Sequence, residues 1–573
     1  MKEWIARTRR DGIEASEGEL AALSRRFGVS ERFARILWLR GLDSPEQVKT
    51  YLDPGLRYLA HPEGWPGMSR AAELIADGLR AGKKLAVWGD YDVDGVTSTA
   101  LVRQVLAHYG HEVLWHQPER QTEGYGMNVA GVEHLAAQGV QLLLTVDCGI
   151  SNVQAVARAK ELGMTVVVTD HHLPPAALPQ ADALCDPRLA DCPCSFLAGV
   201  GVVFFLMAAL NARLAAAGGP RFDMRRTLDL VALGTIADMV ELEGQNRILV
   251  KNGLLLLAEA QRPGVSELKA VSGYAPQAAL EAGQVVFSLA PRLNAAGRMA
   301  SAETALELLC TGDCHRAAEL ARTLDGYNKV RRQEEERITE EAVAQAEAMP
   351  DAPALVIAGT GWNQGVIGIV ASRLVEKYHK PAIILCEDGD TLKGSGRSIS
   401  AFDLHAGLTR CSGELLAYGG HRMAAGVRVQ PDRLEAFRER FLEVVRECLG
   451  PEPLPAVQII DGELDFAAAS DFTFLKELEM MQPFGMGNPE PVFQSPPLLV
   501  ESRRLFGQQK DHVNLKLRDE SCGVSLQAKL WRQAADFPAS LEGARIRLAY
   551  SPSIDRYNGM AGIELKVRDW RQA

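Results

Sequence analysis

The stretch Val87–Ser98, which reads VWGDYDVDGVTS, decides the fold of this chain. It overlaps an apolar run from Leu85 to Trp88 that predicts a short buried strand, which Gly89 ends. Gly95 then opens a pattern that predicts an amphipathic helix running to about His108. Between the predicted strand and helix, carboxylates stand at alternate positions: Asp90, Asp92 and Asp94. The segment between the carboxyl end of a strand and the start of a helix is where α/β folds place their sites.

Three carboxylates on one tight turn repel one another. A bound cation would remove this repulsion, because carboxylate oxygens are good ligands for divalent metals. Alternatively, the aspartates form an Asx-rich turn whose side chains cap the following helix. This stretch alone leaves both interpretations open.

Two further segments repeat the arrangement. Apolar runs at Leu142–Val146 and Thr165–Thr169 are followed by Asp147-Cys148-Gly149 and by Asp170-His171-His172. The helical pattern from Val153 to Leu162 lies between them, so the strands are expected to run parallel. Parallel strands present their carboxyl ends at one edge of a sheet, where metal-type ligands would then meet: Asp92, Asp94, Asp147, His171 and His172. Purely structural roles at all three strand ends are therefore disfavoured.

The composition is that of an ordinary globular protein, with 47% hydrophobic and 24% charged residues among 573. This length predicts roughly two to four domains. No apolar run is expected to reach membrane-spanning length, no membrane partner is expected, and the charged start Met1-Lys2-Glu3-Trp4 carries no secretory pattern. The ten cysteines form no Cys-x-x-Cys pair, which favours reduced thiols and a cytoplasmic location.

The remaining sequence suggests further domains. A long charged helix is predicted over residues 315–348, followed by a second α/β unit with strands at Ala354–Ala358 and Ala382–Leu385. Alternation of period two at residues 513–517 and 563–567 predicts a small β-barrel. The net charge of −11 does not suggest a nucleic-acid partner, but residues 501–573 hold 13 Lys+Arg and 9 Asp+Glu, a net of +4.

The ordered motifs resemble those of a known family. Asp92-x-Asp94, Asp147-Cys148-Gly149 and Asp170-His171-His172 look like the first three motifs of the DHH phosphoesterases, and Asp238 in LGTIADMV (233–240) looks like the fourth. Longer matches narrow the resemblance to the RecJ exonucleases: Arg120 with EGYG (123–126), PRLNAAGR (291–298), KGSGRS (393–398), Gly419-Gly420-His421 and PFGMGNP (483–489). The resemblance extends in order over nearly the whole chain.

This resemblance implies an α/β fold with a DHH phosphoesterase core, a second α/β DHH-associated domain and a C-terminal OB-like β-barrel. The expected parts are a helical N-terminal segment (1–60), a catalytic domain (61–314), a connecting helix (315–350), a substrate-binding domain (351–450) and a nucleic-acid-binding barrel (455–573).

The resemblance also implies two divalent ions, about 4 Å apart. Asp94, Asp147, His171 and Asp238 would hold one ion, and Asp92 and Asp147 the other, with Asp147 bridging. Mixed carboxylate and imidazole ligands favour Mn²⁺, and Mg²⁺ is also plausible. His172 is expected to bind metal or to contact the phosphate, while Asp90 and Asp170 are expected to orient the ligands.

For the substrate, residues 393–398 are expected to form a glycine-permitted loop that binds a terminal phosphate through Ser395 and Arg397. From the residues alone, an ordinary β-turn is the simpler interpretation. Arg120 and Arg298 resemble the arginines that complete the family's phosphate pocket, and His421 resembles a substrate contact on the second domain.

The expected function is a metal-dependent 5′→3′ exonuclease on single-stranded DNA that releases 5′-mononucleotides in recombination and repair. The resemblance implies a RecQ-type helicase and a single-strand-binding protein as partners. One alternative is a DHH phosphoesterase for short oligonucleotides or cyclic dinucleotides, but such proteins generally lack a barrel like residues 455–573. The other is a non-catalytic strand-binding replication scaffold, which the intact set of acidic and histidine residues disfavours.

Overall fold

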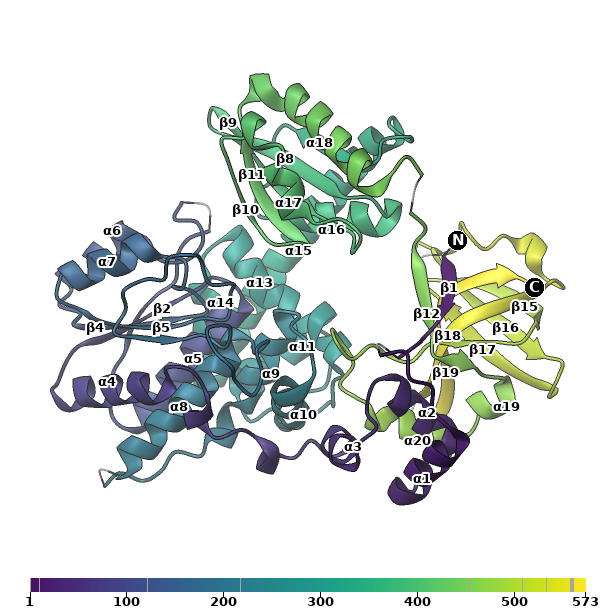
Figure 1. Cartoon of the computed structure of the whole chain (residues 1–573), viewed down its shortest axis with the longest axis horizontal. Helices are drawn as coiled ribbons and strands as arrows, with labels where there is room; N and C mark the ends of the chain where they lie inside the picture. The colour runs from purple at the N-terminus through teal and green to yellow at the C-terminus, as the bar shows by residue number, and fades with distance from the viewer. Residues whose placement is uncertain are drawn as a thin grey trace. The chain divides into compact units, whose positions relative to one another are not determined.

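The computed structural model describes residues 2–9, 11–120, 122–216, 218–452, 454–507, 509–531, 533–556 and 561–573. The chain forms two compact units (Figure 1). One, called the large unit, comprises residues 59–454. The other, called the barrel unit, combines residues 1–58 with residues 455–573. Each unit is considered by itself.

The large unit begins with a five-stranded parallel sheet in the order β3-β2-β4-β5-β6. Its strands are β2 (Leu85–Gly89), β3 (Leu114–His116), β4 (Leu142–Val146), β5 (Thr165–Thr169) and β6 (Ala183–Cys185). The three strands predicted from apolar runs are confirmed, because strands buried on both faces read as continuous hydrophobic segments. Their parallel direction is confirmed as well.

Helices cover both faces of this sheet. Helices α6 (Val129–Ala137) and α7 (Val153–Glu161) lie on one face, above the sheet in Figure 1. The other face carries α4 (Met68–Arg80), α5 (Val93–His108) and α8 (Gly199–Ala216). The prediction of an amphipathic helix after Gly95 is wrong in one respect. Helix α5 begins at Val93 and is buried without interruption as far as Val102, because α8, α9 and the sheet surround it.

Helix α8 corrects another expectation, since by length and composition alone it could cross a membrane. In the structure, 61% of this 18-residue segment is buried, and it packs on α4, α5 and α9 as a core helix does.

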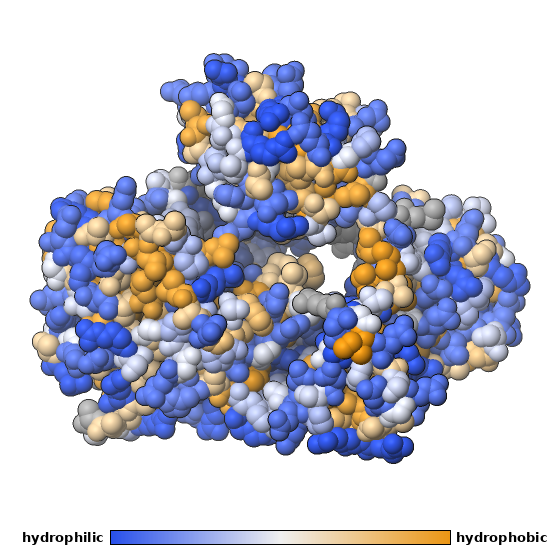
Figure 2. Space-filling model, viewed as in Figure 1, coloured by the Kyte–Doolittle hydropathy of each residue, from blue (hydrophilic) through white to orange (hydrophobic). Residues whose placement is uncertain are grey.

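A mainly helical region then follows: α9 (Leu228–Ala237), α10 (Gly244–Glu259), α11 (Pro263–Val271), α12 (Ala282–Gln284), the π-helix η4 (Val285–Leu289), α13 (Ala290–Met299), α14 (Glu303–Cys310) and the long α15 (Cys314–Glu347). The face shown in Figure 2 is largely hydrophilic, with small apolar patches.

A second sheet completes the large unit, in the order β10-β11-β9-β8-β7. Its elements are β7 (Leu355–Gly359), α16 (Ile367–Tyr378), β8 (Ala382–Asp388), β9 (Thr391–Arg397), α17 (Leu404–Thr409), β10 (Ala417–Gly420), β11 (Ala424–Val429) and α18 (Leu434–Leu449). The predicted loop at residues 393–398 is therefore wrong, because most of it is the central strand β9. A Cβ on Gly394 would lie 2.6 Å from Val427 Cγ2, and one on Gly396 would lie 2.9 Å from Leu404 Cδ2. These glycines allow close packing rather than a turn.

The barrel unit confirms the predicted β-barrel. Its sheet has the order β13-β14-β18-β15-β16-β17-β19, and an additional pairing of β18 with β19 closes it. The strands are β13 (Gly462–Glu463), β14 (Phe493–Gln494), β15 (Leu498–Phe506), β16 (His512–Asp519), β17 (Val524–Leu530), β18 (Arg545–Asp555) and β19 (Gly562–Gln572), with helices α19 (Phe466–Ala469) and α20 (Phe472–Met480).

The N-terminal segment shares its core with this barrel. Strand β1 (Glu3–Ala6) pairs in parallel with β12 (Val457–Ile460), and α1 (Glu17–Phe27), α2 (Glu31–Leu39) and α3 (Pro45–Leu52) follow it. Buried Phe33 and Leu37 of α2 belong to the same hydrophobic core as Phe474 of α20 and Leu515 of β16. The two ends of the chain therefore stabilise one another.

Candidate active site

The carboxyl ends of β2, β4 and β5 bring the predicted ligands together. His171 Nε2 lies 3.1 Å from Asp147 Oδ1, 3.6 Å from Asp238 Oδ2 and 3.9 Å from Asp94 Oδ2. Ligand atoms lie within 4.8 Å of one another in three overlapping sets: Asp94 with His171 and Asp238; Asp147 with His171 and His172; and Asp90 with Asp92 and Asp147. These seven residues are called the carboxylate cluster below.

Backbone donors fix the aspartates that follow β2. Asp92 is the N-cap of α5, and its Oδ1 accepts hydrogen bonds from the N–H groups of Asp94 (2.9 Å) and Gly95 (3.1 Å). The Asp94 carboxylate accepts from the N–H groups of Gly199 (2.7 Å) and Val200 (2.8 Å) at the start of α8. A carboxylate has two oxygens, so the capping interpretation of Asp92 is compatible with metal binding.

Asp147 occupies an unusual backbone conformation at the centre of the cluster. Its φ of 60° lies in the left-handed region that residues other than glycine rarely adopt, and such strain concentrates at functional sites. A Cβ on Gly199 would lie only 2.7 Å from Asp147 Oδ1, so α8 can approach this carboxylate only with glycine there. The fold therefore holds Asp147 in one position despite the strain.

Asp170 orients the two histidines. Its carboxylate accepts from His172 Nδ1 (2.7 Å) and from the backbone N–H groups of Ile150 (2.9 Å) and His171 (2.8 Å). Burial alone would raise the pKa of Asp170, but the hydrogen bond and charge of His172 bring it below its usual value. Burial likewise lowers the pKa of His172, yet the Asp170 carboxylate outweighs this effect and raises it to about 9. In contrast, burial lowers the pKa of His171 below its usual value, which favours the neutral imidazole that metals bind.

The concentration of buried carboxylates in the cluster favours the binding of cations. Burial first, and then the charges of neighbouring carboxylates, raise the pKa values of Asp94 and Asp147 well above the ordinary range. Among the described residues, four buried atoms of the cluster have no partner in hydrogen-bond geometry, although some lie close to one another: Asp90 Oδ1, Asp147 Oδ1, His171 Nε2 and Asp238 Oδ2. A buried polar atom left unpaired costs about 1–3 kcal/mol. Divalent cations would supply partners for all four atoms, so the residues present fit metal ions.

The structure places two residues at the cluster in roles that the sequence does not predict for them. Asp90 is expected from the sequence only to orient ligands, yet it lies in a ligand set with Asp92 and Asp147; its alternate spacing is the available signal. The Tyr125 hydroxyl lies 3.0 Å from His172 Nδ1 and 3.4 Å from the Asp147 carbonyl oxygen. Tyr125 belongs to the EGYG motif, but nothing in that motif indicates which side chain it contacts.

Three arginines form a second cluster, called the arginine cluster. The Arg120 guanidinium lies 5.1 Å from the centre of the Tyr91 ring. Arg298 Nη1 of α13 donates to the Gly365 carbonyl oxygen at 2.6 Å, and Arg397 Nη1 of β9 donates to the Gly396 carbonyl oxygen at 2.8 Å. Within the described part of the chain, none of the three forms an ion pair with a carboxylate.

The positive charges of these arginines repel one another. Burial, followed by the charges of Arg120 and Arg331, lowers the pKa of Arg298 to about 9, and Arg397 contributes to the same effect. Burial and the charge of Arg120 also lower the pKa of Arg397. A bound anion such as a phosphate would relieve this repulsion.

Tyr91 lies within electrostatic range of both clusters. Burial and the charge of Asp90 raise its pKa to about 12, while Arg120 and Arg298 act in the opposite direction, so the neutral phenol feels both clusters. The other predicted substrate residues also lie nearby. Ser395 Oγ accepts from Arg397 Nη1 at 3.2 Å. Burial and the charge of His172 lower the pKa of His421, which follows β10, so these two histidines lie within electrostatic range of each other.

Comparisons with family models and known proteins agree with this architecture. Residues 84–235 match the DHH family N-terminal domain, residues 351–447 the DHHA1 domain and residues 460–569 the RecJ OB domain. The fold predicted from the sequence is thereby confirmed.

Full-length relatives match as well. The single-stranded-DNA-specific exonuclease RecJ of Escherichia coli (strain K12) is 35% identical over 593 residues, covering 99% of both chains. The same enzyme of Bacillus subtilis (strain 168) is 35% identical over 561 residues, covering 96% of this chain and 69% of the relative. The crystal structure of RecJ from Thermus thermophilus in complex with Mn²⁺ superposes with a TM-score of 0.83 at 31% identity, covering 100% of this chain and 80% of that one. The chain therefore belongs to the RecJ family of single-stranded-DNA-specific exonucleases.

Proposed function

We propose that this chain is a metal-dependent exonuclease that degrades single-stranded DNA from its 5′ end and releases 5′-mononucleotides in recombination and repair. The single observation that carries this proposal is the arrangement around Tyr91. A cation-binding cluster and an anion-binding cluster adjoin one another in the large unit, with Arg120 close to both Tyr91 and Asp90. This arrangement suits a strand whose end is held beside the bond to be cut.

The carboxylate cluster is the proposed catalytic centre. Two divalent ions, Mn²⁺ or Mg²⁺, would activate a water and neutralise the charge that develops on the phosphodiester. Asp94, Asp147, His171 and Asp238 would hold one ion, and Asp92 and Asp147 the other, with Asp147 bridging; Asp90 is a further candidate ligand. The protonated His172 is suited to contact a phosphate oxygen, and its hydrogen bond to Asp170 fixes the ring. The set agrees with relatives whose structures carry Mn²⁺ and Mg²⁺.

The arginine cluster is the proposed site for the terminal 5′-phosphate. Arg120, Arg298 and Arg397 would neutralise its charge, with Ser395 as a further hydrogen-bonding group. His421 would contact the strand from the side of β10. Because Tyr91 and Arg120 connect this cluster electrostatically to the carboxylates, the first phosphodiester bond would be the one that reaches the metals. Digestion would then proceed 5′→3′ and yield mononucleotides.

The barrel unit would bind the rest of the strand. OB-type barrels bind single strands through basic grooves and aromatic stacking, and residues 501–573 carry a net charge of +4. We further propose the five-part domain division expected from the sequence, a cytoplasmic location, and cooperation with a RecQ-type helicase and a single-strand-binding protein.

The test is degradation of a 5′-phosphorylated single strand carrying a label at either end, with and without Mn²⁺. The proposal expects the 5′ label to appear at once as a mononucleotide, and the reaction to require the metal. Initial release of a 3′ label would contradict the polarity. Cleavage confined to strands of a few nucleotides or to cyclic dinucleotides would favour a small-substrate phosphoesterase. Strand binding without cleavage under any metal would favour a scaffold.

A further inference from the structure

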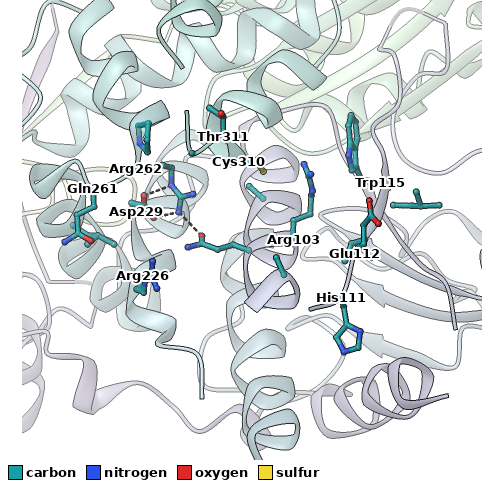
Figure 3. Close-up of a pocket in the computed structure, with 18 of the residues that line it drawn as sticks. Arg103, His111, Glu112, Trp115, Arg226, Asp229, Gln261, Arg262, Cys310 and Thr311 are labelled. Carbon is teal, nitrogen blue, oxygen red and sulfur yellow. Dashed lines mark hydrogen bonds and ion pairs between the residues drawn. The ribbon is translucent and has the colours of Figure 1, made fainter. Parts of the chain in front are cut away.

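A separate cavity of about 790 Å³ lies in the same domain as the carboxylate cluster (Figure 3). It is called the Arg103 cavity. Its walls come from α5 (Arg103, Gln104, Ala107), the region of β3 (Val113, Trp115), the start of α9 (Asp229) and the end of α14 (Cys310, Thr311), together with Arg226 and Arg262. This volume is typical of a site for a small organic ligand.

The cavity is distinct from the active site but shares two helices with it. In α5, Asp94 of the carboxylate cluster stands in the first turn, and Arg103 follows nine residues later. In α9, the order is reversed, because Asp229 stands in the first turn and Asp238 caps the last. At 1.5 Å per residue, roughly 14 Å of helix separates the two sites along each path. The packed helices α5 and α9 therefore carry a metal-ligand candidate at one end and a cavity residue at the other.

Arg262 ties these helices together at the cavity. Its guanidinium donates to Asp229 Oδ2 of α9 at 2.7 Å, to Gln104 Oε1 of α5 at 2.8 Å and to the Leu309 carbonyl oxygen of α14 at 2.8 Å. Figure 3 shows the bonds between Arg262 and Asp229 as dashed lines. Asp229 is buried, and Arg262 neutralises its charge. This pair is therefore structural and leaves no free charge for a ligand.

Two other arginines of the cavity remain available to bind an anion. Arg103 and Arg226 both line the cavity, and within the described residues neither forms an ion pair with a carboxylate. The Arg103 guanidinium lies 5.8 Å from the centre of the half-buried Trp115 ring.

Four acidic side chains lie near these arginines. Glu112 lines the cavity and is exposed, and Glu303 and Glu307 share an adjoining hollow with Arg103, where Glu307 pairs with Arg316. Asp223, whose pKa the charge of Arg226 helps to lower, pairs with Arg225. The cavity thus offers two guanidinium groups without a carboxylate partner among the described residues, one beside Trp115 and Cys310 and the other beside Phe222.

We propose that the Arg103 cavity is a regulatory site for a nucleoside phosphate. The phosphates contact Arg103 and Arg226, because a single guanidinium group can donate two parallel hydrogen bonds to phosphate oxygens. The base packs against Trp115 and the apolar wall, since an aromatic ring stacks on any base. Occupancy changes how tightly the carboxylate cluster binds Mn²⁺, because α5 and α9 connect the two sites. This site is additional to the proposed nuclease function and does not depend on it.

Binding is tested by calorimetric titration of the full-length protein with ADP and with pyrophosphate in the presence of EDTA. All proteins carry Arg397→Ala, which weakens phosphate binding at the arginine cluster. The expected result is that Arg103→Ala with Arg226→Ala weakens ADP binding roughly ten- to a hundredfold. The matched control replaces Arg70 and Arg80, two exposed arginines of α4 in the same domain, and should leave the affinity unchanged.

Further variants separate the parts of the proposal. Trp115→Leu should weaken ADP but leave pyrophosphate unaffected, because pyrophosphate has no base. Should the double alanine variant fail to fold, Arg103→Lys with Arg226→Lys retains the charge, loses the paired hydrogen bonds, and should still weaken binding. Equal ADP affinity with and without these arginines, or no binding of either probe at millimolar concentration, would overturn the site. Equal effects of Trp115→Leu on both probes would overturn the role of the base.

The coupling is tested through the Mn²⁺ dependence of nuclease activity in the protein with Arg397 intact. Saturating ADP should shift the half-saturating Mn²⁺ concentration roughly fivefold or more. ADP itself chelates Mn²⁺, so the comparison is made with the Arg103→Ala/Arg226→Ala variant under the same conditions. Without ADP this variant should match the parent, and with ADP it should show only the chelation effect. Identical shifts in both proteins would overturn the regulatory role.

Discussion

The carboxylate cluster and the arginine cluster both act on Tyr91, and both collect like charges in buried surroundings. In the first, Asp94 and Asp147 retain protons more tightly than usual because burial and neighbouring carboxylates disfavour their charge. In the second, Arg298 and Arg397 hold their protons less tightly because burial and neighbouring guanidinium groups disfavour theirs. Among the described residues, no ion pair joins the two sets of charges, and both act on the pKa of Tyr91.

An ordinary ion pair of the same domain shows what the clusters lack. Arg262 Nε lies 2.7 Å from Asp229 Oδ2, and both side chains are largely buried. The two charges neutralise one another and leave none for a ligand. The carboxylate cluster instead holds five aspartates against two histidines, and the three arginines have no carboxylate partner among the described residues, so each cluster can bind a ligand of the opposite charge. The difference shows that the large unit holds like charges close together, despite their repulsion, in two places. One place is suited to cations and the other to a phosphate.

The largest effect is expected on the cation side. Asp147→Ala should reduce cleavage at least roughly a thousandfold, because this carboxylate lies in two of the three ligand sets. Initial rates on a 5′-phosphorylated strand give the measurement. The control is Asp182→Asn, which removes a carboxylate bonded to Lys160 outside the cluster and should leave the rate nearly unchanged. A folded Asp147→Ala protein with activity within roughly tenfold of the parent would exclude a bridging role.

A smaller and more selective effect is expected on the anion side. Arg397→Ala should lower kcat/KM roughly ten- to a hundredfold on strands with a 5′-phosphate, since a charge-assisted hydrogen bond contributes about 1.5–3 kcal/mol. The loss should be much smaller on strands with a 5′-hydroxyl, which lack the charged group. Arg428→Ala is the matched control, because Arg428 lies on the neighbouring strand β11 and pairs with Asp388. Equal losses on both substrates would show that Arg397 contacts another part of the strand.

The third prediction asks whether both clusters suffice without the barrel unit. Helix α2 shares a hydrophobic core with the barrel, so the informative fragment is residues 59–454 rather than a simple C-terminal deletion. This fragment retains both clusters and should still cleave slowly in the presence of Mn²⁺. Its affinity for long strands should fall roughly tenfold, and the salt dependence of binding should weaken. Unchanged affinity over several salt concentrations would remove the barrel unit from strand binding.

The smallest expected effect is on stability, and its sign follows from the raised carboxyl pKa values. A carboxyl group with a raised pKa in the folded chain stabilises that chain at low pH, and the contribution is lost as pH rises through the raised pKa. Mn²⁺ displaces the retained protons, so its stabilising effect should grow with pH. The rise in Tm on adding Mn²⁺ should be larger at pH 8 than at pH 6 by roughly 2–4 °C. An Asp147→Asn protein should show a smaller difference, and equal rises in the parent at both pH values would contradict this account.

The carboxylate cluster is easier to predict from the sequence than the arginine cluster. Strands β2, β4 and β5 are buried on both faces and therefore visible as apolar runs, and each is followed directly by its ligands. Their convergence follows from parallel topology alone. The N–H groups of Gly199 and Val200 that hold Asp94 cannot be predicted, because they come from a helix that is more than a hundred residues away along the chain.

The arginine cluster is harder to predict for a physical reason. Arg120, Arg298 and Arg397 come from a loop, a helix and a strand that no local pattern connects, and only the family resemblance places them together. The run Lys393–Ser398 resembles a turn because of its two glycines. Those glycines instead make room for Val427 and Leu404, which are distant in the sequence. Similarly, the burial of α5 depends on neighbours that its own sequence does not show.

The central claim is that the arginine cluster holds a 5′-phosphate where the first phosphodiester bond meets the carboxylate cluster. Its most direct test is a crystal structure with Mn²⁺ and a 5′-phosphorylated oligonucleotide whose first linkage resists hydrolysis. The account predicts anomalous manganese peaks beside Asp147, the terminal phosphate in contact with Arg397, and the first linkage at the metals. A terminal phosphate bound elsewhere, or a strand that enters with its 3′ end, would contradict it.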